Sequence, residues 1–108
     1  MKIVDSKEAI DRLIDENDMV LIYFGSDTCS VCVDMKPKVE KILERYPKIK
    51  AVEVEIDKSV KLSTNYNIFT IPAILLFIDG KESIREARHI SMEDLGQKIN
   101  RYYNLFFR

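Results

Sequence analysis

The fold is decided by residues 19–32, which read MVLIYFGSDTCSVC. Residues 19–24 form an apolar run of strand length that is rich in β-branched and aromatic side chains, and the turn-forming residues 25–27 end it. Apolar residues at helical spacing follow directly. The segment therefore predicts a strand buried on both faces, a short turn and a helix, with Cys29 and Cys32 where the turn gives way to the helix.

The helix is predicted over Ser30 to Tyr46, because apolar residues recur there every three or four positions. These positions are Val31, Met35, Val39, Ile42, Leu43 and Tyr46. Pro37 lies inside the pattern, where it removes a backbone donor and is expected to kink the helix. Pro47 follows the predicted end.

The rest of the chain adds further helices and strands. They are a helix capped by Asp5 or Ser6, a strand over Ala51 to Ile56, a short helix over Val60 to Tyr66, a strand over Ala73 to Ile78, a strand over Glu82 to Arg88 and a helix that begins near Ser91. Asp79-Gly80 is a hairpin signal between two of these strands. The order predicts an α/β fold of three layers, with helices on both faces of a mixed central sheet.

Length and charge exclude several classes of protein. The 108 residues suit a single domain, predicted to span residues 1–108. Seventeen Lys and Arg against eighteen Asp and Glu leave a net charge of −1, so no overall positive field attracts phosphate or anionic lipid. We therefore expect no binding to nucleic acid.

The chain also lacks the apolar segments that target or anchor a protein to a membrane. The amino terminus is charged from Lys2 onward, unlike a secretory signal. The longest apolar run, Ile71 to Ile78, is far shorter than the roughly 20 residues that cross a bilayer. We expect a cytoplasmic protein that has no association with a membrane.

Cys29 and Cys32 are the only cysteines, and their spacing favours redox chemistry. Two intervening residues in the first turn of a helix bring both sulfurs within bonding reach with little backbone movement. Cys29 lies at the amino end of the helix, where free backbone N–H groups and the helix dipole favour an anion. Its thiolate is the predicted attacking group, and Cys32, one turn further, is suited to resolve a mixed disulfide.

Three other interpretations of the cysteine pair are open. A zinc site needs four ligands, and two cysteines with His89, the only histidine, do not supply them, so no metal is expected. Two inert buried thiols at helical spacing are the second interpretation. The third is a static structural disulfide, which a reducing cytosol disfavours.

A second motif, residues 70–80, reads TIPAILLFIDG and places Pro72 at the head of an apolar strand. With the cysteine pair, and with Pro37 five residues after the second cysteine, this motif resembles the thioredoxin family over nearly the whole chain. The resemblance implies the thioredoxin fold and a cis peptide bond before Pro72. It also implies that the backbone of Ile71 pairs with an extended segment of the substrate.

The same resemblance implies a thiol–disulfide oxidoreductase of the protein disulfide reductase type. Cys29 would attack a disulfide in a protein substrate, and Cys32 would release the reduced partner. Thr28, Ile71 and Pro72 would contact the substrate. Electrons would come from an upstream reductase or a low-molecular-weight thiol, without an organic cofactor. The alternative is a protein-binding or adaptor module of the same fold that does not turn over.

The residues beneath the dithiol depart from the family pattern. Tyr23 and Glu53 stand where the family commonly has a buried Asp and its Lys partner. Glu53 has two interpretations. It is either a solvated side chain on a tilted strand, or a carboxylate, hydrogen-bonded to Tyr23, that accepts the proton of Cys32.

The rim of the site departs from the pattern as well. Gly25 stands where the family often has a tryptophan, and Arg88 with its neighbour stands where the family often has a glycine. The side chain of Arg88 is interpreted either as solvated in a loop or as a positive charge that favours the thiolate of Cys29.

Overall fold

The computed structural model describes residues 1–108 and contains five strands and four helices. The strands are β1 (Lys2–Ile3), β2 (Met19–Gly25), β3 (Ile49–Glu55), β4 (Ala73–Ile78) and β5 (Lys81–Ala87). The helices are α1 (Lys7–Glu16), α2 (Ser30–Leu43), α3 (Val60–Asn65) and α4 (Met92–Phe106). All the predicted elements are present in the predicted order, and β1 is an addition.

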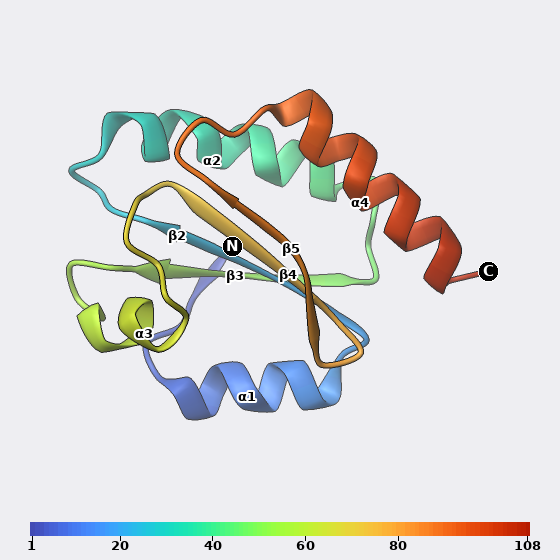
Figure 1. Cartoon of the computed structure of the whole chain (residues 1–108), viewed down its shortest axis with the longest axis horizontal. Helices are drawn as coiled ribbons and strands as arrows, with labels where there is room; N and C mark the ends of the chain where they lie inside the picture. The colour runs from blue at the N-terminus through green and yellow to red at the C-terminus, as the bar shows by residue number, and fades with distance from the viewer.

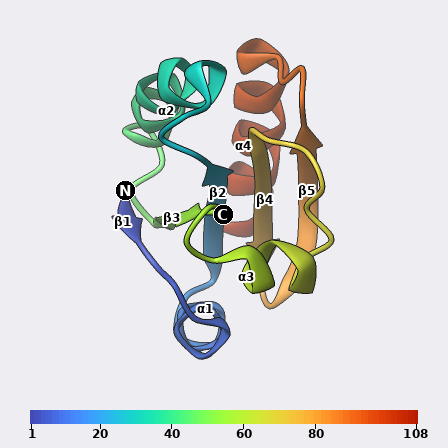
Figure 2. The same cartoon turned by 90° about the vertical axis from the view of Figure 1, so that its left-hand side faces the viewer.

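The strands form one mixed sheet in the order β1-β3-β2-β4-β5. β1, β3 and β2 are parallel, whereas β4 is antiparallel to both β2 and β5. α1 and α3 cover one face of the sheet, and α2 and α4 cover the other (Figure 1, Figure 2). This is the three-layer α/β architecture that the sequence predicts.

Two apolar clusters hold the layers together, and β2 contributes to both because its side chains alternate between the two faces. Leu21 and Tyr23 pack in the cluster under α2 and α4, whereas Ile22 and Phe24 pack in the cluster under α1 and α3. Every residue of β2 is buried. The turn that carries the cysteines is therefore anchored to the centre of the molecule.

Serine side chains cap the amino ends of two of the helices. Ser6 Oγ accepts a hydrogen bond from Ala9 N at the start of α1, and Ser91 Oγ accepts one from Asp94 N at the start of α4, both at 3.1 Å. The hairpin between β4 and β5 turns at Asp79-Gly80, where both residues have positive φ (51° and 79°). No helix reaches the length and hydropathy that crossing a membrane demands.

The helix after the dithiol ends earlier than predicted. α2 stops at Leu43 rather than at Tyr46, and a turn follows in which Tyr46 N donates to Leu43 O at 2.9 Å. Tyr46 is buried nevertheless, because its ring packs on Tyr103 of α4 with centroids 5.0 Å apart. The apolar pattern thus continues past the end of the helix. α2 is continuous through Pro37.

β1 was not predicted because its two residues are exposed and show no apolar alternation. Lys2 and Ile3 pair with Val52 and Glu53 of β3. β3 is therefore flanked by strands on both sides, and Glu53 lies inside the sheet rather than at its edge. This position bears on the site described next.

Candidate active site

The two cysteines lie at the junction between β2 and α2. Cys29 is the N-cap residue of α2, and its Sγ accepts a hydrogen bond from Cys32 N at 3.2 Å. The two residues form a disulfide with their Cα atoms 5.2 Å apart. Cys29 is half-buried, whereas Cys32 is only 2% exposed. An incoming group can therefore reach Cys29 but not Cys32.

The amino end of α2 presents a hydrogen-bond donor to the sulfur of Cys29. The Cys32 N–H that points at Sγ is one of the free donors of the first helical turn. Such a donor, together with the positive end of the helix dipole, lowers the pKa of a thiol. The geometry therefore supports a nucleophilic sulfur at the surface with a second sulfur directly behind it.

Tyr23 lies beneath the dithiol and is fixed there by a hydrogen bond. Its hydroxyl donates to the carbonyl oxygen of Cys32 at 2.6 Å. Burial, and secondarily the negative charge of Glu53, raises the pKa of Tyr23 to about 12. Tyr23 is therefore a protonated donor at neutral pH and not a base.

Gly25 has no side chain, and this leaves the space that the Tyr23 ring occupies. A Cβ atom at Gly25 would lie 3.2 Å from Cys32 Cβ and 3.3 Å from Tyr23 Cε2. Contacts this short require the neighbouring groups to move. The large aromatic residue at 23 and the missing side chain at 25 are thus parts of one packing arrangement.

Glu53 lies beside Tyr23 on the adjacent parallel strand. It is 7% exposed, and the ammonium of Lys36 lies 2.8 Å from its Oε1. The ion pair with Glu53 raises the pKa of Lys36. Two expectations are therefore wrong: Glu53 is buried rather than solvated, and its partner is Lys36, because the Tyr23 hydroxyl is directed at the backbone of Cys32.

Lys36 was not identified from the sequence. It lies four residues after Cys32 in α2, so both side chains project from the same face of the helix toward the sheet. That spacing is the signal that could have revealed it, but an isolated lysine on a helix is more often solvated. The buried acceptor that makes Lys36 informative comes from a distant part of the chain.

A polar network holds the turn before the dithiol. Ser26 Oγ hydrogen-bonds to the carboxylate of Asp57 and lies 2.9 Å from Thr28 Oγ1. The backbone N of Asp27 donates to Glu55 Oε2 at 3.0 Å. Thr28, expected to contact substrate, is exposed and tied to this network. The network fixes the backbone that leads into Cys29.

The Ile71–Pro72 peptide bond is cis, as the family resemblance implies. Pro72 immediately precedes β4, and its neighbour Ala73 pairs with Phe24 at the end of β2. Since the chain leaves β2 at that point for the dithiol, this register places Pro72 beside the turn that carries Cys29. Pro72 is buried and Ile71 is half-buried.

The backbone of Arg88 is hydrogen-bonded to the loop that contains Pro72. Its N–H donates to the carbonyl oxygen of Pro72 at 3.0 Å, and its φ of 66° lies in the left-handed region. The residue is exposed, and its guanidinium forms no ion pair. The structure therefore brings the backbone of Arg88 to the site while its charge lies in solvent.

The side chains do not form a recognisable metal centre. No group of three or more His, Cys, Asp or Glu residues is arranged to hold a metal ion. His89, the remaining residue considered as a zinc ligand, is exposed.

Comparison with known proteins agrees with this geometry. The Thioredoxin family model matches residues 1–101. The thioredoxin-like protein YdfQ of Bacillus subtilis is 35% identical over 98 residues, which are 91% of this chain and 88% of that protein. A thioredoxin of Mycoplasmoides gallisepticum is 27% identical over 99 residues, 92% of this chain and 99% of the relative.

A similarity to solved structures supports the fold. A mutant thioredoxin from Halobacterium salinarum superposes with a TM-score of 0.85 at 24% identity, and the match covers 94% of this chain and 89% of that one. Oxidised thioredoxin from Plasmodium falciparum gives a TM-score of 0.83 at 24% identity over 95% of this chain and 98% of that one.

Proposed function

This chain belongs to the thioredoxin family and is a thiol–disulfide oxidoreductase, and from that premise we propose that it reduces disulfide bonds in other proteins. The observation that carries the proposal is the placement of the two sulfurs. Cys29 is accessible at the start of α2 and accepts a backbone N–H bond, while Cys32 lies buried within bonding distance of it.

The reaction consists of two thiol–disulfide exchanges. The thiolate of Cys29 attacks one sulfur of the substrate disulfide, and the other substrate sulfur leaves as a thiolate and takes up a proton. Cys32 then loses its proton and attacks the sulfur of Cys29, which releases the second substrate thiol. The substrate gains two electrons and two protons, and the Cys29–Cys32 disulfide forms.

The proton of Cys32 needs an acceptor, and we assign this role to Glu53. Its carboxylate is buried next to Tyr23, whose hydroxyl contacts the backbone of Cys32. The ammonium of Lys36, 2.8 Å from Oε1, holds the carboxylate in place beneath the dithiol. Tyr23 acts as a positioning residue, because its pKa of about 12 leaves it protonated.

The substrate segment would lie over the cis-proline loop and the exposed turn. Ile71 and Pro72 support an extended substrate strand, and Thr28 borders it on the side of the dithiol. Phe69, two residues before Ile71, is 82% exposed and adds apolar area to a rim that has no tryptophan. Arg88 borders the same loop through its bond to Pro72. These contacts suit an unfolded or extended protein segment.

The sulfurs themselves carry the electrons, so the proposed reaction requires no organic cofactor and no metal. Each turnover leaves a disulfide that an upstream reductase or a low-molecular-weight thiol must reduce. We place this cycle in the cytoplasm, because glutathione and thioredoxin systems keep that compartment reducing and favour the reductive direction. Its role there is electron transport to protein disulfides and cell redox homeostasis.

Turnover of a protein disulfide tests the proposal. We expect the protein to accelerate the reduction of insulin by dithiothreitol, and Cys29→Ser to lower the rate to that of dithiothreitol alone. In the absence of dithiothreitol, prereduced Cys32→Ser is expected to form a stable mixed disulfide with insulin, because Cys29 can still attack but no resolving thiol displaces it. Equal insulin reduction by the unaltered protein and Cys29→Ser would reject the proposal and indicate a binding module instead.

A further inference from the structure

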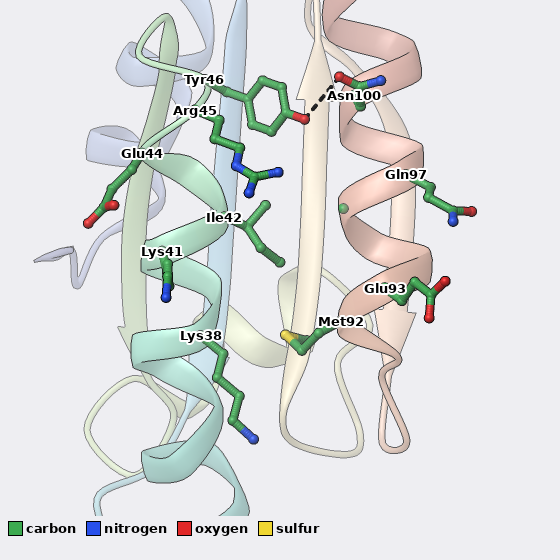
Figure 3. A pocket seen from close by; sticks show the side chains of 11 residues that line it. Lys38, Lys41, Ile42, Glu44, Arg45, Tyr46, Met92, Glu93, Gln97 and Asn100 are labelled. Carbon is green, nitrogen blue, oxygen red and sulfur yellow. Dashed lines mark hydrogen bonds between the residues drawn. The ribbon is translucent and has the colours of Figure 1, made fainter.

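A groove of about 840 Å³ runs between α2 and α4, and neither cysteine lines it (Figure 3). Ile42 of α2 and Met92 of α4 give it an apolar floor. At one end the hydroxyl of Tyr46 donates to Asn100 Oδ1 at 3.1 Å and closes it. The proposed redox chemistry leaves this groove without a role.

One wall of the groove is positively charged. Lys38, Lys41 and Arg45 are spaced three and four residues apart, so they lie on one face of α2 and the turn that follows it. Lys38 and Arg45 reach toward α4 in Figure 3. None of the three forms an ion pair within the chain. Like charges at this spacing destabilise a helix. The cluster of three cations is therefore unfavourable until an oppositely charged group binds to it.

Acidic residues nearby do not neutralise this wall. Glu44 and Glu93 also line the groove, but their carboxylates point away from its centre in Figure 3 and form no ion pair with the basic wall. Glu40, which lies within the same stretch of α2, pairs with the amino-terminal ammonium at 2.8 Å. The three cations therefore remain available to an external anion.

The opposite wall contains a notch at Gly96. A Cβ atom built there meets no other atom within 4 Å. Gly96 lies in the interior of α4, where glycine lowers helix stability relative to alanine. The open position therefore leaves space for a side chain from another molecule, next to the apolar surface of Met92.

We propose that the groove between α2 and α4 binds an acidic segment of a partner protein. Its carboxylates pair with Lys38, Lys41 and Arg45, and an aliphatic side chain occupies the notch at Gly96. Charge complementarity selects the acidic partner, and the apolar floor selects a peptide over a simple polyanion. Lys38 lies eight residues after Ser30, roughly 12 Å along the helix, so a bound partner also lies near the dithiol.

Binding of a cysteine-free fluorescent peptide of alternating Glu and Leu tests the proposal. We expect saturable binding that weakens with salt, and a roughly tenfold or greater loss of affinity in Lys38→Glu/Arg45→Glu. Lys50→Glu/Lys81→Glu changes the net charge equally on other exposed surfaces and is expected to bind like the parent. Gly96→Leu places a side chain in the notch, where its Cβ meets no other atom within 4 Å, and is expected to weaken binding several-fold.

Two comparisons complete the test. Cys29→Ser/Cys32→Ser is expected to bind the peptide unchanged, so a failure of the proposed reductase activity and a failure of this site are distinguishable. Equal binding by the Lys38→Glu/Arg45→Glu variant and its control overturns the proposal. Equal binding of a peptide of alternating Glu and Ser also overturns it, because that result would show a general polyanion site.

Discussion

The hydroxyl of Tyr23 donates a hydrogen bond of 2.6 Å to the carbonyl oxygen of Cys32. The bond joins the central strand β2 to the first turn of α2, directly beneath the buried sulfur. Tyr23 is 1% exposed, so neither group can exchange this partner for water. The backbone of the resolving cysteine is thereby held from below by a group that does not ionise at neutral pH.

Removing this bond is expected to lower stability more than activity. Tyr23→Phe keeps the ring and deletes the donor, so the free energy of unfolding should fall by about 1 kcal/mol at neutral pH. Urea unfolding of the oxidised protein measures it. Insulin reduction should stay within a few-fold of the parent, because both sulfurs and Glu53 remain. An inactive but stable Tyr23→Phe protein would show instead that the phenol takes part in the reaction.

The Tyr23→Phe variant is also expected to change how the stability of the protein depends on pH in the alkaline range. Tyr23 has a pKa of about 12 when folded against a usual value of 10.0, so the folded protein keeps a proton that the unfolded chain loses. Stability therefore falls as the pH rises from 10.0 toward 12, and Tyr23→Phe removes that part of the slope. Urea midpoints across this range measure the difference between the two proteins.

The Lys36–Glu53 pair should matter because Glu53 is buried. Lys36→Met leaves an unpaired carboxylate, and we expect a loss of about 1–2 kcal/mol, less than for a fully buried pair because Lys36 remains partly exposed. Glu53→Gln added to Lys36→Met is expected to restore most of the loss. Lys7→Met breaks an exposed pair with Asp11 and serves as control, with an expected loss of stability much smaller than that of Lys36→Met. Equal losses in Lys36→Met and Lys7→Met would contradict a special role for the buried pair.

Glu53→Gln also separates the two steps of the reaction. The amide cannot accept a proton, so resolution of a mixed disulfide by Cys32 should slow by about tenfold or more near neutral pH. The rate should recover as the pH approaches about 8.5, where free thiols ionise unaided. Alkylation of Cys29 should follow the same pH profile in both proteins. Rapid-mixing kinetics of each step provide the measurement, and identical resolution profiles would remove Glu53 from the mechanism.

The chemistry of the site was predictable where it depends on neighbours in sequence. The strand, the turn and the N-cap position of Cys29 follow from one continuous stretch, and Pro72 stands at the head of a recognisable strand. The role of Lys36 was not predictable, since it depends on the buried carboxylate of Glu53. The burial of Glu53 in turn depends on β1. The two residues of β1 are exposed and pair with β3 through their backbone, which leaves no pattern in the side chains.

Gly25 should not tolerate even a methyl group. In Gly25→Ala the new Cβ would lie 3.2 Å from Cys32 Cβ and 3.3 Å from the Tyr23 ring, so we expect a loss of about 1–3 kcal/mol. Gly96→Ala meets no atom within 4 Å and should instead gain about 0.5–1 kcal/mol from helix propensity. Thermal unfolding of the two variants compares them. A neutral Gly25→Ala would mean that the Tyr23 ring can move aside freely.

Arg88 combines a strained backbone with a charge that faces solvent. Its φ of 66° favours glycine, so Arg88→Gly is expected to stabilise the protein by about 0.5–1 kcal/mol. Asn67→Gly, at a φ of 56°, should gain less because asparagine tolerates this conformation better.

The charge of Arg88 is tested separately from its backbone. Arg88→Asn removes the charge at a position that keeps a side chain, and Arg88→Lys retains the charge. If the guanidinium favours the thiolate, alkylation of Cys29 will require a higher pH in Arg88→Gly and Arg88→Asn but not in Arg88→Lys. Because the side chain is exposed, we expect a small shift that disappears at high salt. Superimposable alkylation profiles for all three variants at low salt would confine the role of Arg88 to its backbone contact with Pro72.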